Sequence, residues 1–374
     1  MRRIVVAAML SLITAPMLTA DVSIIERREA HTKVNGGKPG RSHHPGGATG
    51  SQALVDSQGL KYFINTNITF STSSSASGAA SEASYTHAVA ASTSGGGTTM
   101  STPNDAYDGY NTLCLSLNNT VATCETGNAN FVIYDKNGPA TTECPGPISH
   151  VNRQVDFPPQ TAGSIQMSRK VFVPDNDQFA RWLNYFTNTG GTPQTVTAVI
   201  ANNLGSDSNT IIVSDSGGNT SPDVTSTWVT TFQNYNPAPR STDVRLGHVL
   251  QQTGAAVPLS GIFFANGNDN PFWGYTFTLA PGETKIIANF GVGQPSKAAA
   301  NAKSAQLAGS AVSGLPPNAL QCLSTAEQAE IANFSAAPAP PIATVPTLSW
   351  GALAALVMLL GIAAVTFLRR RATA

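Results

Sequence analysis

The sequence contains few charged residues. They make up 11% of the 374 residues, against about a quarter in typical globular domains. Small and polar residues are abundant instead, which favours an exported, β-rich chain over a cytosolic helical one. Between the two terminal segments lie 16 of the 21 basic residues and all 21 acidic residues, so this part carries a net charge of about −5. Nucleic acid and anionic lipid headgroups are therefore not expected as partners.

Cysteine is also scarce, with four in the chain: Cys114, Cys124, Cys144 and Cys322. No C-x-x-C pair and no nearby histidine pair accompanies them, which argues against a zinc site. In an oxidising compartment disulfides are expected, and three complete pairings are possible. We favour Cys114 with Cys124, because the Asn-Asn pair at 118–119 between them suits a turn. Cys144 would then join Cys322.

No complete catalytic set is present. Residues 214–218 (SDSGG) resemble the nucleophile loop of chymotrypsin-like proteases, but Ser214 replaces that family's Gly and Asn219 its Pro. Neither His87 nor His150 lies in a matching histidine motif, so a polar hairpin turn is preferred. We predict no enzyme, no catalytic residue and no cofactor.

Carboxylates and aromatic residues leave two alternatives open. Glycosidases need two carboxylates held close together, yet most acidic residues here lie in turn contexts such as 174–177 and 266–270. Calcium is possible in such loops, but neither has full EF-hand spacing, and no metal site is predicted. Exposed aromatic residues would bind polysaccharide, although in strands the core is the preferred place for them. The aromatic candidates are Trp182, Trp228, Trp273, Phe263, Phe264 and Tyr275. The acidic candidates are Asp175, Asp177, Asp207, Asp215, Asp223, Asp243, Asp269 and Glu283. His248, with Arg240 and Arg245, is expected in a loop with no identified partner.

The N-terminal segment has the order of a secretory signal peptide. Arg2 and Arg3 precede an apolar run and then small residues ending at Ala20, so residues 1–20 are expected to be cleaved. Residues 21–51 are rich in Gly, His and charge without apolar periodicity, and are expected to be a flexible lead-in.

Residues 52–293 are predicted to form an antiparallel β-sandwich. Short segments with apolar alternation are separated by turn signals, including the Asn-Thr-Gly-Gly turn at 188–191 and the Ala-Pro-Gly-Glu turn at 280–283. β-structure is also favoured within the small-residue stretch 83–94. The predicted strands are 163–173, 179–186, 195–200, 211–213, 226–232, 262–264, 273–279 and 285–290. The layout loosely resembles the supersandwich found in many carbohydrate-active enzymes.

Residues 294–335 are predicted to be helical. Ser296 is expected to cap a helix running to about Val312, and residues 324–327 form a capping box for a second helix ending near Phe334. Residues 336–346 are an Ala/Pro linker, stiff and extended.

Residues 348–368 are uncharged and mostly apolar, and as a helix they would reach about 30 Å, enough to span a bilayer. Arg369, Arg370 and Arg371 follow as a stop-transfer cluster that should stay cytoplasmic. A single transmembrane helix is therefore expected, with everything before it outside.

The same tail resembles a known class of signals. Val345, Pro346, Thr347 and Leu348, then Ser349 followed by Trp350 and Gly351, an apolar helix and an arginine cluster, are similar to the IPTL-CTERM class of bacterial sorting signals. That class shares its layout with the PEP-CTERM signals handled by exosortase-type membrane enzymes. The usual pattern has Ile where Val345 stands and one more residue before the Trp-Gly pair. The resemblance covers residues 345–371 and implies recognition by a membrane-bound sorting enzyme.

Taken together, these features predict an exported bacterial cell-envelope protein, anchored in the inner membrane by its C-terminal helix before any processing to the cell surface or outside. A structural or adhesive role at the surface or in an exopolysaccharide matrix is the main hypothesis. A carbohydrate-binding or carbohydrate-cleaving sandwich is the alternative.

Overall fold

The computed structural model describes residues 50–66, 76–93, 97–124, 129–138, 153–206, 209–234, 243–309 and 315–335, together with 358, 359 and 369. The chain divides into two compact units, Met1–Ala337 and Pro338–Ala374. Every strand described here lies in the first unit.

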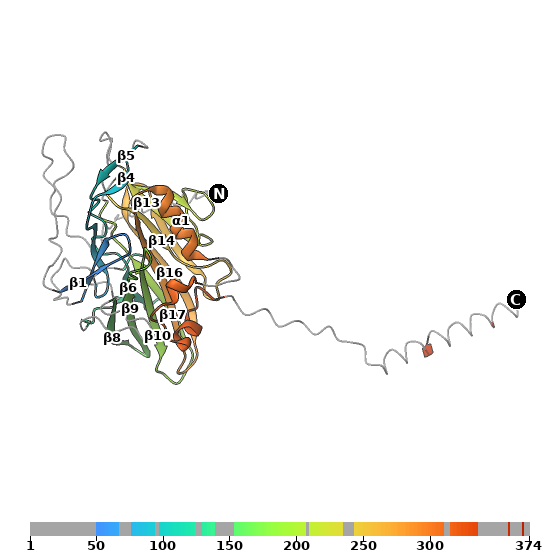
Figure 1. Ribbon diagram of the computed structural model, residues 1–374. Coiled ribbons are helices and arrows are strands. Elements are labelled where there is room, and N and C mark those ends of the chain that lie inside the picture. The colour runs from blue at the N-terminus through green and yellow to red at the C-terminus, as the bar shows by residue number, and fades with distance from the viewer. Residues whose placement is uncertain are drawn as a thin grey trace, which may run out of the picture. The chain divides into compact units, whose positions relative to one another are not determined.

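The described strands form four antiparallel sheets (Figure 1). The largest has the order β12-β13-β14-β17-β10-β9-β8, and the second β15-β16-β11-β6-β7. The first contains β8 (Gln154–Ala162), β9 (Ile165–Phe172), β10 (Ala180–Asn188), β12 (Thr210–Asp215), β13 (Trp228–Gln233), β14 (Arg245–Val249) and β17 (Thr284–Gln294). The second contains β6 (Thr112–Ser116), β7 (Phe131–Ile133), β11 (Gln194–Ala201), β15 (Leu259–Ala265) and β16 (Asn268–Leu279).

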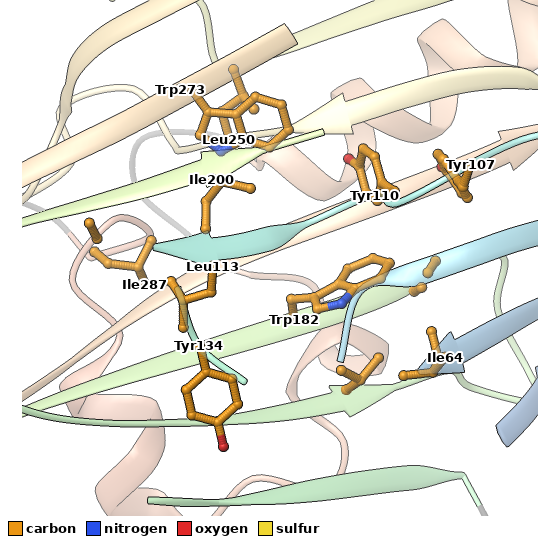
Figure 2. Packing of buried hydrophobic residues seen from close by; sticks show 14 of the residues in the cluster. Ile64, Tyr107, Tyr110, Leu113, Tyr134, Trp182, Ile200, Leu250, Trp273 and Ile287 are labelled. Atoms are coloured by element: carbon orange, nitrogen blue, oxygen red, sulfur yellow. The ribbon is translucent and has the colours of Figure 1, made fainter. Parts of the chain in front are cut away.

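The two large sheets share one apolar core, as predicted for a sandwich. Figure 2 shows Trp182 and Ile287 from the seven-stranded sheet beside Leu113, Ile200 and Trp273 from the five-stranded sheet, and all five belong to one buried cluster. Burying each such side chain contributes about 1.5–3 kcal/mol, so this layer is the main source of stability.

The seven-stranded sheet is buried on its other face too. In β10, Trp182 and Phe186 belong to the sandwich core, whereas Leu183 belongs to a second cluster that includes Leu307 and Phe334 from the C-terminal segment. Period-two alternation therefore sends apolar side chains to both faces. The covering elements are α1 (Lys297–Ala308), the 3₁₀ helix η2 (Pro317–Leu320) and α2 (Thr325–Glu330), and α1 lies along β13 and β14 in Figure 1.

The helix starts agree with the sequence prediction, and the ends come earlier. Ala299 N donates to Ser296 Oγ at 3.1 Å, and Ser324 with Glu327 forms the predicted capping box. The first helix stops at Ala308 instead of about Val312, because Gly309 takes φ +70° and ψ 178°, a conformation outside the helical region that favours glycine. The second stops at Glu330, well before Phe334.

Both predicted glycine turns exist, but each joins strands of different sheets. Residues 188–191 connect β10 of the seven-stranded sheet to β11 of the five-stranded sheet, and residues 280–283 connect β16 to β17. Sequence alternation does not distinguish a hairpin from such a crossing, because both need a tight polar turn.

Two smaller sheets complete the described fold. One has the order β1-β2-β3, with β1 (Ser51–Val55), β2 (Leu60–Asn65) and β3 (Ala80–Tyr85). The other pairs β4 (Val89–Ser92) with β5 (Thr98–Ser101). Strands β3 and β4 confirm β-structure in the small-residue stretch, and side chains such as Tyr62 and Ile64 join the sandwich core.

The favoured disulfide is present: Cys114 in β6 is bonded to Cys124, ten positions later. Cys322 also takes part in a disulfide. Its predicted partner, Cys144, lies outside the described residues.

Candidate functional site

The predicted sorting signal falls in a part of the chain of which little is described. Val345, Pro346, Thr347, Leu348, Trp350 and Gly351 lie outside the described residues, as do Arg370 and Arg371. Met358, Leu359 and Arg369 are helical and exposed. None of the helices within the described ranges combines the length and apolar character that a bilayer span requires. The transmembrane helix at 348–368 and the sorting motif therefore stay predictions.

Half of the six candidate sugar-binding aromatic residues lie in the core. Trp182, Trp273 and Tyr275 are fully buried. The Trp182 Nε1 donates to Gly78 O at 2.7 Å, and the Tyr275 hydroxyl donates to Leu250 O at 2.6 Å. Trp182 and Tyr275 are therefore held by packing and hydrogen bonding and Trp273 by packing, as preferred from their places in strands.

One candidate aromatic residue stays accessible. Phe263, in β15 at the edge of the five-stranded sheet, is 37% exposed and stacks on Phe272 with ring centroids 5.2 Å apart. Its neighbour Phe264 instead stacks on buried Trp273. Trp228 is half-buried and packs against the second cluster.

The protease-like segment is the turn of the β12–β13 hairpin. The Asp215 Oδ1 accepts hydrogen bonds from Gly217 N at 2.9 Å and Asn219 N at 2.7 Å, and its Oδ2 accepts one from Ser226 Oγ at 2.8 Å. Ser214 Oγ donates to the Asp215 carbonyl. Asp215 thus closes the turn, which confirms the hairpin interpretation.

Other candidate carboxylates also serve turns. Glu283 accepts from Ala280 N at 2.7 Å and pairs with Lys285; these contacts, led by the Lys285 hydrogen bond, lower the pKa of its carboxyl group. Asp223 accepts from both the hydroxyl and the amide of Thr225. Within the described ranges, no group of three His, Cys, Asp or Glu side chains is placed to hold a metal ion.

The predicted loop around His248 is wrong: His248 and Arg245 belong to β14, inside the large sheet. His248 is fully buried, with Nε2 3.0 Å from Thr231 Oγ1 and Nδ1 3.1 Å from the Tyr110 hydroxyl. Burial lowers the pKa of its imidazole to about 3, so the ring is neutral at neutral pH. Arg240 lies outside the described residues. Because the sequence R-L-G-H-V contains polar side chains, this buried strand was not predicted.

Buried arginines are a feature that the sequence analysis missed. Arg169 and Arg181 are fully buried, and their guanidinium groups donate mainly to backbone carbonyls. Arg169 Nη2 donates to Asn111 O at 2.9 Å, and Arg181 Nη1 to Ala319 O at 2.6 Å and Gln321 O at 2.7 Å. These hydrogen bonds fix loops and η2 onto the sheet. Burial lowers the pKa of Arg169 to about 9 and that of Arg181 to about 10, so both stay charged at neutral pH.

One cluster brings reactive side chains together from three elements. Lys303 of α1 forms an ion pair through Nζ with Asp177 Oδ1, in the loop between β9 and β10. The two side chains are only 11% and 10% exposed. Asp177 Oδ1 also accepts from Gln178 N at 2.8 Å, and Oδ2 accepts from Asn318 Nδ2 at 3.1 Å. The carboxyl group is therefore held by donors on both oxygens.

Asp56 lies beside this pair, in the turn between β1 and β2. The amide of Ser57, the next residue, donates to the Asp177 carbonyl at 3.1 Å. Asp56 Oδ1 accepts from Gln58 N and Leu60 N, both at 2.9 Å, an ordinary turn arrangement. Its Oδ2 is buried and has no hydrogen-bond partner among the described residues. Burial first, and the charge of Asp177 in addition, raise the pKa of Asp56 from 3.8 to about 7.

The cluster therefore contains an amine, a polarised carboxyl group and a second carboxyl group that holds its proton near neutral pH. The sequence analysis assigned Asp177 to a turn and did not single out Asp56 or Lys303. Asp177 and Lys303 are 126 positions apart in the sequence, so nothing in their local context indicated that they lie close together.

The sequence matches no protein-family model and no curated protein. Distantly similar solved structures exist. They include a polysaccharide lyase (12% identity, 67% of this chain and 34% of that chain, TM-score 0.35) and a galactose mutarotase-like protein from Lactobacillus casei ATCC 334 (10% identity, 66% and 100%, TM-score 0.34). A heparan sulfate lyase, HepC from Pedobacter heparinus, is similar at 12% identity over 69% of this chain and 38% of that chain, with a TM-score of 0.32. The chain thus spans little more than a third of either lyase. Similarity at these TM-scores carries no argument about activity.

Proposed function

We propose that this chain is an exported envelope protein whose β-sandwich is presented outside the cytoplasm and whose C-terminal tail is a sorting signal. Its role is that of a structural or adhesive component of the cell surface or extracellular matrix. The observation that carries the proposal is the ordered pattern at residues 345–371: a V-P-T-L motif, a Trp-Gly pair, an apolar stretch and three arginines.

Two features of the first unit support this proposal. The Cys114–Cys124 disulfide suits an oxidising compartment. The candidate catalytic segment at 214–218 is used for turn formation.

Fractionation of cells that express the full chain tests the sorting role. A variant carrying Pro346→Ala and Thr347→Ala should stay in the membrane fraction, whereas the wild-type protein should leave it. A matched variant with Pro340→Ala and Pro341→Ala alters prolines of the linker outside the motif and should behave as wild type. Equal retention of all three proteins would contradict a sorting signal.

Carbohydrate binding is a second candidate function, and Phe263 favours it. An exposed ring that stacks on a second ring offers a flat apolar face of the kind on which sugars pack. Isothermal titration with oligosaccharides of the producing cell's own matrix should show binding that Phe263→Ala reduces at least tenfold. Met100→Ala, which removes another exposed apolar side chain, is the control and should leave binding unchanged. No heat of binding with any of these sugars would remove this candidate.

A further inference from the structure

Lys303, Asp177 and Asp56 have the groups needed to form an amide bond within the chain. A lysine amine and an aspartate carboxyl group are already in contact, and both are about nine-tenths shielded from water. A third group, Asp56, is 5% exposed and has a buried oxygen without a partner in the described part of the chain. An ordinary surface ion pair needs neither the shielding nor the second acid.

We propose that Lys303 and Asp177 become joined by an intramolecular amide cross-link, with Asp56 relaying protons during its formation. The link ties α1 to the loop between β9 and β10. It is a covalent modification of the chain by itself and requires no cofactor.

The first requirement is a neutral amine. For the reaction, a proton must move from Lys303 Nζ to the Asp177 carboxylate within the ion pair, and shielding from water lowers the cost of forming the neutral pair. The result is a free amine lone pair facing a protonated carboxyl group. Contact between the groups supplies the proximity that an uncatalysed reaction in water lacks.

The second requirement is an electrophilic carbon. The amide of Gln178 donates to Oδ1 of Asp177 and the side-chain amide of Asn318 donates to Oδ2. Both donors withdraw electron density from Cγ and stabilise the negative charge that develops on oxygen when nitrogen attacks.

Lys303 Nζ forms a bond to Asp177 Cγ, and the carbonyl π electrons move to oxygen. Asp56 gives its proton to that oxygen and takes a proton from the nitrogen. Asp56 then gives a proton to one of the two hydroxyl groups, the C–O bond breaks, and that oxygen leaves as water. The remaining hydroxyl group gives its proton back to Asp56 as the C=O double bond of the amide forms. The products are one amide and one water, and Asp56 ends protonated, as it began.

Asp56 suits this relay because it retains a proton near neutral pH, with a pKa of about 7. A second ion pair provides the contrast. Lys170 and Glu327 are more exposed, at 28% and 15%. Burial alone would raise the pKa of Glu327, but hydrogen bonds from Lys170, Tyr185 and Ser324 outweigh it and hold the pKa at about 2. Water also reaches this pair more readily than it reaches Lys303 and Asp177. Lys170 and Glu327 should stay unlinked.

Intact-mass spectrometry of the purified full-length chain, with its disulfides reduced, tests the proposal. The mass should fall short of the sequence mass, after any removal of terminal segments is accounted for, by one water. Peptide mapping should find a branched peptide that joins Lys303 to Asp177, and trypsin should not cleave after Lys303. Folded wild-type protein with the full mass and two linear peptides would overturn the proposal, whatever the variants do.

Variants test the roles of Lys303, Asp56 and Asp177 one at a time. Lys303→Arg keeps the positive charge but has no nucleophilic amine, so the full mass should return. Asp56→Asn should slow formation by about 100-fold or more, since a general acid–base group contributes that much. Asp177→Asn should form the same amide with loss of ammonia in place of water. Lys170→Arg is the matched control and should keep the deficit of one water.

Discussion

Asn333 joins the C-terminal segment of the first unit to the sandwich, and its removal should destabilise the fold strongly. The side chain is fully buried. Its Nδ2 donates to Leu250 O at 2.7 Å and to Ala288 O at 2.6 Å, and its Oδ1 accepts from Ala288 N at 2.9 Å. Three hydrogen bonds therefore connect this residue to β17 and to the residue after β14.

The expected loss follows from those bonds. Asn333→Ala removes three hydrogen bonds worth about 1 kcal/mol each and leaves the buried amide and carbonyl of Ala288 without this partner, which adds roughly 1–2 kcal/mol. The free energy of unfolding should fall by about 3–5 kcal/mol. Asn333→Asp, which keeps the shape but cannot donate to the two carbonyls, should be no better tolerated.

Urea unfolding of the oxidised protein, followed by tryptophan fluorescence, measures the change. The midpoint should move to lower urea with an unchanged slope. Gln328→Ala is the control, because Gln328 is exposed on α2 and its side chain makes one hydrogen bond, at 3.3 Å to Leu323 O. It should change the free energy by less than about 0.5 kcal/mol. A loss below about 1 kcal/mol for Asn333→Ala would contradict the role of Asn333 in joining the C-terminal segment to the sandwich.

The pKa of Asp56 is raised from 3.8 to about 7, so the folded state binds the extra proton between these values and the contribution of Asp56 to stability should fall as the pH rises from about 4 to about 7. The fall is on the order of 4 kcal/mol. Because the lowered pKa of His248 acts in the opposite direction over much of this range, urea titrations should find the fall as the difference between Lys303→Arg, where no cross-link forms, and the same protein with Asp56→Asn added. Replacing Cys114 and Cys124 with serine opens a loop of ten positions, and thermal unfolding should report a loss of about 3 kcal/mol, whereas an unchanged melting temperature would contradict a stabilising bridge. Gly247→Ala places a Cβ 2.1 Å from a serine hydroxyl on α1 and should cost about 1–3 kcal/mol in urea unfolding. Gly191→Ala, with nothing within 4 Å, should be neutral, and equal effects at the two sites would be inconsistent with the packing of α1.

Apolar alternation predicted much of the sandwich. Strands such as β9, β10 and β11 lie where alternation placed them, because one face of each strand enters the core. The capping residues Ser296 and Ser324 also marked helix starts, since the caps act within one turn and are visible locally.

Other parts depend on contacts that local sequence does not encode. Strand β8 contains Pro158 and Pro159, which argue against a strand, yet it lies at the sheet edge with a register shift between Phe157 and Gln160, where missing amide donors are tolerated. Strand β14 was not predicted because it contains polar residues. Their partners, such as Tyr110 for His248, come from distant segments. The cluster of Lys303, Asp177 and Asp56 is formed by tertiary packing alone.

The mass of the C-terminal peptide of the exported protein tests the central claim most directly. Protein collected outside the cytoplasmic membrane should begin near Asp21 and end between Val345 and Leu348, and so lack the arginine cluster. A chain that still carries Arg369, Arg370 and Arg371 in the membrane fraction, for both the wild type and the Pro346→Ala, Thr347→Ala variant, would show that the tail is a simple anchor and contradict the sorting account.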